Sequence, residues 1–184
     1  MEGAVQEPEP QVIGAARTGD LGAFESLVRL YQGDVWRLTY QLLRDHNLAD
    51  DVTQDAFLRA FRFLPRFRGD SKFSTWLFAI ARNCALDELR RAGRRKTLVD
   101  ELGRVDQPRL SEPTLRIEIR EAVAALTLEL REPIVLIDMF GLSYSEVGSI
   151  LRLPVGTVKS RVHRARQLLA DRLLSDPERA RDEA

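Results

Sequence analysis

Several features common in other proteins are scarce in this 184-residue sequence. Cys84 is the only cysteine, so no disulfide can form within the chain and no cysteine-based zinc cluster is possible. No uncharged run approaches the ~20 apolar residues that a membrane-spanning helix needs. The amino-terminal stretch MEGAVQEPEP also lacks the basic start and the apolar run of a signal peptide. We therefore expect a cytoplasmic protein without direct membrane insertion.

Groups that carry out catalysis are equally sparse. The two histidines, His46 and His163, lie in segments unrelated to each other and to Cys84. We find no glycine-rich phosphate loop and no paired carboxylates in a plausible pocket. The sequence therefore predicts no enzymatic activity, no catalytic residue, no metal site and no cofactor.

A surplus of one charge is absent as well, because 28 basic and 28 acidic residues give a formal net charge of zero. The charges are nevertheless sorted along the chain. Residues 82–96 contain six basic and two acidic side chains, a net of +4, and residues 152–172 contain six basic and one acidic, a net of +5. Basic clusters of this kind are often no more than solvated helix faces, but two of them are also compatible with nucleic-acid binding.

Apolar residues recur at steps of three and four through most of the chain, and no segment alternates convincingly like a strand. We expect an all-α protein with helices near residues 11–18, from an N-cap at Asp20 to about Arg44, and from Asn47 to the stop at Pro65. Another helix is expected after Ser74 or Thr75. Further on, Pro133 is expected in the first turn of a helix over residues 134–140, with Gly141 as its stop.

The last two expected helices form a helix-turn-helix. Ser143 and Glu146 have the spacing of a capping box for a short helix to about Leu151, and a longer helix is expected from about Gly156 to Leu174. On the longer helix, a buried stripe should consist of Val158, Val162, Ala165 and Leu169. The polar side chains outside that stripe could contact DNA, and they are Thr157, Lys159, Ser160, His163, Arg164 and Arg166.

The segment from Phe67 to Trp76, FRGDSKFSTW, precedes the first basic cluster. Aromatic and small polar groups beside a cationic helix suit single-stranded DNA, because an unstacked base needs a flat site and its phosphates need positive charge. By composition alone, however, Phe73 and Trp76 are more typical of a hydrophobic core.

These motifs resemble one family. DDVTQDAFLRAF (50–61), FRGDSKFSTWLFAIARN (67–83) and LSYSEVGSILRLPVGTVKSRVHRARQLL (142–169) are similar, in content and order, to extracytoplasmic-function (group IV) sigma factors of the sigma-70 superfamily. The resemblance implies two small helical domains joined by a flexible linker. It divides the chain into a disordered lead-in (1–10), sigma domain two (11–95), the linker (96–112), sigma domain four with the helix-turn-helix (113–174), and a tail (175–184).

The resemblance also implies roles for individual residues. The surface that binds core RNA polymerase, on the clamp of its largest subunit, would comprise Asp51, Gln54, Asp55, Phe57 and Phe61. The minus-ten promoter element would be bound and melted by Arg68, Lys72, Phe73, Ser74, Asn83, Arg90 and Arg91. The minus-35 element would be read by Lys159, Ser160, His163 and Arg164, with Thr157 and Arg166 beside them.

The resemblance further implies two partners, the flap of the second-largest polymerase subunit and an anti-sigma factor. The main alternative is an autonomous regulator that uses only the helix-turn-helix on duplex DNA. That reading would leave the FRGDSKFSTW segment without a purpose.

Overall fold

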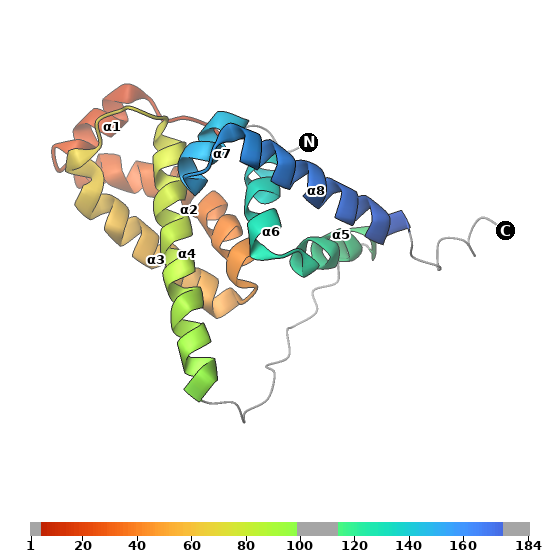
Figure 1. The fold of residues 1–184 in the computed structure, drawn as a ribbon. Helices are drawn as coiled ribbons and strands as arrows, with labels where there is room; N and C mark the ends of the chain where they lie inside the picture. The colour runs from red at the N-terminus through yellow and green to blue at the C-terminus, as the bar shows by residue number, and fades with distance from the viewer. Residues whose placement is uncertain (1–4, 99–113, 175–184) are drawn as a thin grey trace.

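The computed structural model describes residues 5–98 and 114–174, and the side chains of residues 5–93 and 119–174. Within these ranges all regular structure is helical, which confirms the predicted all-α class. Figure 1 shows the arrangement of the elements. The first helical region comprises α1 (Pro10–Arg17), α2 (Leu21–Leu43), α3 (His46–Phe63), a 3-10 turn (Leu64–Arg66) and α4 (Phe73–Leu98). The second helical region comprises α5 (Thr114–Ala125), α6 (Leu128–Ile134), a π-helical turn (Val135–Met139), α7 (Tyr144–Leu151) and α8 (Val155–Leu174). None of the described helices is long and apolar enough to cross a membrane.

Side-chain caps fix where the helices of the first region begin. The Asp20 carboxylate accepts from Ala23 N at 3.0 Å at the start of α2, as predicted. The Asp45 carboxylate accepts from Leu48 N at 2.9 Å at the start of α3, so the cap lies two residues before the predicted Asn47. Between them, Arg44 takes a left-handed conformation with φ of 60°, which ends α2 and turns the chain into α3.

The core of the first region lies where α2, α3 and α4 meet. Tyr31 and Val35 from α2, Ala56 from α3, and Phe78 and Ala85 from α4 are all completely buried. The predicted apolar stripes of these helices therefore face one another. Phe24 and Val28 come before Tyr31 on α2 at steps of four and three residues, and they lie only half-buried at the edge of this core.

The second region departs from prediction at Pro133. This proline lies inside the helix that begins at Leu128 and runs on into the π-helical turn, rather than opening a new helix. A proline cannot donate to the preceding turn, and a wider π-helical turn follows directly after it. Gly141 has φ of 66°, so the predicted left-handed stop is present. Ser143 and Glu146 form the predicted capping box at α7.

The two regions pack against each other, and one cluster of buried apolar residues runs through both. The rings of Phe78 (α4) and Phe140 lie 5.0 Å apart between centroids. Next to them, the Arg82 guanidinium binds the Glu132 carboxylate through two hydrogen bonds, Nε to Oε1 at 2.6 Å and Nη2 to Oε2 at 3.1 Å. Lys72 Nζ lies 2.8 Å from Glu146 Oε1 of α7. We call this packing of the two regions the closed arrangement.

Two boundaries differ from the predicted division of the chain. Residues 5–9 make specific contacts with the first region and α1 already begins at Pro10, where a disordered lead-in was expected. The α4 helix also continues past residue 95, the predicted end of sigma domain two, to Leu98. Most of the predicted linker and all of the predicted tail lie outside the described residues.

Candidate nucleic-acid interface

The side chains of α8 form a buried apolar stripe and an exposed polar side, as the sequence predicts. Val158, Val162 and Ala165 are at most 1% exposed, so the buried stripe is confirmed for these three positions. Five of the six predicted DNA-contacting side chains are exposed outside this stripe. Arg166 is paired with an acid, as described below, and the other four are Lys159, Ser160, His163 and Arg164. The buried stripe fixes the helix to the region while its polar groups point to solvent. This is the geometry that a recognition helix requires.

Some polar side chains of α8 also have partners within the region. Arg166 binds Asp138 of the π-helical turn, with Nη2 to Oδ1 at 2.6 Å and Nε to Oδ2 at 3.3 Å. This pair holds α8 against the turn, and the Asp138 hydrogen bond is the main reason that the pKa of Arg166 is raised. Lys159 Nζ lies 5.8 Å from the ring centroid of Tyr144 in α7. Thr157 is half-buried. Of the six residues predicted to contact DNA, four therefore point to solvent, Thr157 is half-buried, and Arg166 is paired with Asp138.

The turn between α7 and α8 packs closely against Gly148 of α7. A Cβ atom at this position would lie 2.9 Å from the carbonyl oxygen of Leu153, closer than real Cβ contacts. The Leu153 N–H donates to the Gly148 carbonyl at 3.0 Å, and Arg152 adopts a left-handed φ of 56°. The absence of a side chain at Gly148 thus lets the two helices approach closely enough to form the helix-turn-helix.

Hydrogen bonds also hold the start of α7. Glu146 Oε2 accepts from Ser143 N at 2.8 Å, while Oε1 faces Lys72 across the contact between the regions. Burial alone would raise the pKa of Glu146, but the hydrogen bonds from Lys72 and Ser143 outweigh it and lower that pKa. One carboxylate therefore both caps the helix-turn-helix and joins it to the first region.

The predicted minus-ten residues on α4 fall into two groups. Asn83, Arg90 and Arg91 are exposed along the helix, as are Arg68 and Lys72 before it. Arg90 and Arg91 each pair with an acid three residues earlier on the same helix, Arg90 with Asp87 at 3.0 Å and Arg91 with Glu88 at 3.5 Å. Figure 1 shows the carboxyl-terminal half of α4, which carries these arginines, extending past the other helices.

Phe73 and Ser74 form the second group, and both are buried. Phe73 is 2% exposed and packs against Phe67, Trp76 and Tyr31, with ring centroids 5.4–5.8 Å apart. Ser74 is 1% exposed. A ring enclosed by three other aromatic residues has little surface left for a DNA base in this conformation, and the minus-ten role that the resemblance implies for Phe73 stays a prediction. Its composition-based reading as a core residue is the one that the packing supports.

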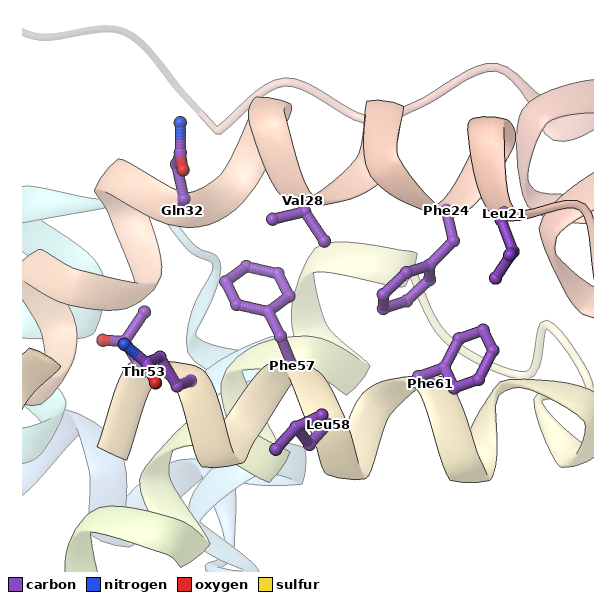
Figure 2. A pocket seen from close by; sticks show the side chains of 9 residues that line it. Leu21, Phe24, Val28, Gln32, Thr53, Phe57, Leu58 and Phe61 are labelled. Carbon is purple, nitrogen blue, oxygen red and sulfur yellow. The ribbon is translucent and has the colours of Figure 1, made fainter. Parts of the chain in front are cut away.

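A groove between α2 and α3 contains most of the residues predicted to bind polymerase. The groove has a volume of about 510 Å³, and its lining includes Gln54, Phe57 and Phe61. Figure 2 shows Phe61 facing Phe24 across it, and their ring centroids are 4.9 Å apart in an edge-to-face arrangement. Leu58 in the same lining is 58% exposed. Apolar side chains left open to water in this way are typical of a docking surface.

Sequence reasoning missed part of this groove. Leu21, Phe24 and Val28 of α2 line it, although the spacing of Phe24 and Val28 indicated only a core stripe and Leu21 was not assigned to any site. Their position on the flank of that stripe, where α3 does not cover α2, depends on how the two helices cross. Asp51 is exposed and Asp55 half-buried on α3, and Asp55 pairs with Arg59 at 2.9 Å.

Comparison with known proteins agrees with this geometry. The family model for sigma-70 region 2 matches residues 27–95, and the model for sigma-70 region 4 matches residues 116–169. The sequence is 35% identical over 179 residues to the RNA polymerase sigma-H factor of Pseudomonas aeruginosa, covering 89% of this chain and 93% of that protein. The chain belongs to the extracytoplasmic-function sigma factors. Its identity to the sigma-E factor of Escherichia coli K12 is also 35%, over 88% of this chain and 92% of the relative.

Solved structures show the same fold. A sigma factor RpoE in complex with the anti-sigma factor NepR, from Bartonella quintana, superposes with a TM-score of 0.72 at 29% identity, covering 85% of this chain and 99% of that one. CnrH in complex with the cytosolic domain of CnrY superposes with a TM-score of 0.69 at 28% identity, covering 90% and 97%. This sigma factor therefore directs RNA polymerase to specific promoters. The autonomous regulator is not favoured, because region 2 matches as well as region 4.

Proposed function

We propose that α8 is the helix that reads the minus-35 element of the promoter. The observation that carries this proposal is the separation of faces on α8, where a fully buried apolar stripe lies opposite Lys159, Ser160, His163 and Arg164. These side chains offer amine, hydroxyl, imidazole and guanidinium groups to base edges and phosphates in the major groove. Thr157 lies beside them near the amino-terminal end of the helix, where side chains penetrate the groove most deeply.

The minus-ten element is the proposed ligand of α4. Arg90 and Arg91 supply positive charge for the phosphates of the non-template strand, and Asn83 supplies an amide for hydrogen bonds. Arg68 and Lys72 extend the same cationic surface toward the loop before α4. Single strands are bound through such positive tracks, so this surface can hold the strand that is exposed when the promoter melts.

The apolar groove between α2 and α3 is the proposed site for the clamp of the largest polymerase subunit. Phe61 and Leu58 offer exposed apolar surface, and Gln54 and Asp51 provide polar groups at its margin. An amphipathic helix lying in such a groove would bury its apolar face there. We further propose that the second region contacts the flap of the second-largest subunit.

An anti-sigma factor is the proposed regulatory partner. The two structural neighbours described above are sigma factors bound to anti-sigma factors, NepR and CnrY, and both are similar to this chain over 85% or more of its length. By analogy with these two complexes, this protein would also bind an anti-sigma factor.

The minus-35 assignment is tested by a Lys159→Ala variant in the holoenzyme. On a duplex promoter this variant should lose roughly 5- to 150-fold in affinity, since a well-placed base contact contributes ~1–3 kcal/mol. On a forked template that is already melted at minus ten and lacks the minus-35 duplex, binding should be unchanged. Arg172→Ala, which removes a charge at an exposed position nearly four turns further along α8, is the control. Equal losses on both templates would contradict the assignment of this face.

A further inference from the structure

The chain's own amino-terminal segment occupies the first turn of α4. The Glu7 carboxylate accepts hydrogen bonds from Phe73 N at 3.0 Å and from Ser74 N at 3.3 Å, and the Ser74 hydroxyl donates to it as well. Sixty-six residues separate Glu7 from Phe73 in the sequence. These are the free backbone donors that every helix has at its amino terminus, and here a distant carboxylate fills them.

Further contacts hold this segment in place. The Tyr31 hydroxyl donates to the Gln6 carbonyl at 2.7 Å, and Val5 packs against the main hydrophobic cluster. Burial raises the pKa of Tyr31, and the charges of Glu7 and Asp34 raise it further. The Tyr31 hydroxyl therefore stays protonated and able to donate. The segment is thus anchored on both sides of the carboxylate, by Val5 and Gln6 before it and by α1 after it.

The turn that Glu7 covers has strong anion-binding character. The amino-terminal end of a helix carries a partial positive charge, and Lys72 directly precedes α4. The pKa of Lys72 is raised, first by its hydrogen bond to Glu146 and also by the charge of Glu7. Thr75 in the same turn is 4% exposed, and its hydroxyl has no hydrogen-bond partner among the described residues. Two carboxylates from distant parts of the chain are thus bound here, Glu7 by the first turn of α4 and Glu146 by the lysine that precedes it.

A phosphate of a DNA strand would seek the same donors as the Glu7 carboxylate, because both are anionic oxygen acceptors at a helix amino terminus. The turn directly follows Lys72, which belongs to the surface that the proposed function assigns to the minus-ten strand. We propose that Glu7 acts as an intramolecular competitor that occupies this turn in the free protein and is displaced when a single strand of DNA binds. This inference rests on the proposed minus-ten surface.

A purely structural role for Glu7 predicts the opposite result. If Glu7 only caps α4, its removal should loosen the start of α4 and weaken DNA binding. If it competes with DNA, its removal should strengthen binding. The sign of the change in affinity therefore separates the two roles.

The experiment uses the full chain and a fluorescein-labelled single-stranded 12-mer of randomised sequence at low salt. Glu7→Gln and Glu7→Ala are compared with the wild type by fluorescence anisotropy. Glu9→Gln is the matched control. This substitution removes the same charge two residues away, from an exposed side chain that makes no capping hydrogen bond to α1. We expect both Glu7 variants to bind the 12-mer about five- to tenfold more tightly, because the DNA no longer has to displace a carboxylate from the first turn of α4. The control should match the wild type.

Unchanged or weaker binding by the Glu7 variants overturns the inference, and a lower thermal midpoint alongside it identifies Glu7 as a structural cap. A double Arg90→Ala, Arg91→Ala variant tests the underlying surface separately. If that variant loses binding while the Glu7 variants gain none, only the inference fails. If it binds like the wild type, or if no variant binds at all, the proposed minus-ten surface is wrong and the inference falls with it.

Discussion

The ion pair between Arg82 and Glu132 is the polar contact whose loss should most affect the closed arrangement. It joins α4 of the first region to α6 of the second, and both side chains are largely buried, with 16% and 6% of their surfaces exposed. The carboxylate binds the guanidinium with both of its oxygens, at 2.6 and 3.1 Å. Replacing Glu132 with alanine leaves that guanidinium without its charge partner in an apolar setting.

The expected cost follows from the burial of the pair. Removing one partner of a buried ion pair costs ~3–5 kcal/mol, because the remaining charge stays desolvated. Arg82 retains some access to water, which places the cost near the lower end, at about 3 kcal/mol. Since 1.4 kcal/mol is a factor of ten, the ratio of closed to open molecules should fall by roughly 100-fold. The cost falls on the contact between the regions, because the core of the first region is packed by other residues.

Distances between paired spin labels can measure this opening. Labels at Glu25→Cys on α2 and Gln167→Cys on α8 report the separation of the regions, and both positions are exposed. Cys84 need not be removed, since it is 2% exposed and burial raises its pKa to about 12, so it resists labelling. The wild type should give one narrow distance distribution. Glu132→Ala should give a broader distribution at longer distances.

Two further variants test the reasoning. Glu129→Ala on the same helix removes a pair between an exposed carboxylate and the half-buried Arg161, at 3.4 Å. It should leave the distances unchanged, because a pair that is open to solvent contributes little. Replacing both partners, as Arg82→Met with Glu132→Leu, should keep the closed arrangement, since an apolar pair carries no desolvation cost. If Glu132→Ala keeps the narrow distribution of the wild type, the ion pair does not hold the regions together.

Three other predictions concern the groove, the turn and the cap. Leu58→Asp should weaken binding to core polymerase at least tenfold in a competition assay, whereas Phe63→Asp, on the same helix, 48% exposed but outside the groove lining, should not. Gly148→Ala should lower the free energy of unfolding by ~1–3 kcal/mol through overpacking, whereas Gly156→Ala, with open space around its Cβ, should be neutral or stabilising in thermal unfolding. The lowered pKa of Glu146 means that its contribution to stability is present above the unfolded value of 4.5 and is lost as pH falls through the lower folded value. Thermal midpoints between pH 7 and pH 3 should therefore fall more steeply for the wild type than for Glu146→Gln, and parallel curves would contradict this.

Features that depend on neighbouring residues could be predicted from the sequence. The cap at Asp20, the capping box at Ser143 and the buried stripe of α8 each follow from the identity and spacing of residues within one or two turns. Such interactions are decided locally, so reading along the chain is enough to find them. The family motifs likewise lie in continuous segments and identified both sigma regions.

Features that depend on distant parts of the chain could not be predicted in this way. The partners Glu7 with Phe73 and Arg82 with Glu132 are separated by 66 and 50 residues, and nothing in either local sequence indicates the other. The groove could be predicted only from the way in which α2 and α3 cross, since this crossing places Phe24 at the margin of the core. Sequence spacing indicates that a side chain is apolar and on one face, but the packing decides whether another helix covers it.

The most direct test of the account is transcription in vitro with purified core polymerase, this protein and a fragmented genomic DNA library, followed by sequencing of transcript 5′ ends. We predict discrete start sites that appear only when both proteins are present and that share two conserved elements upstream, near minus ten and minus 35. Identical start sites with core polymerase alone, or no specific initiation with both proteins, would contradict the conclusion that this chain directs polymerase to promoters.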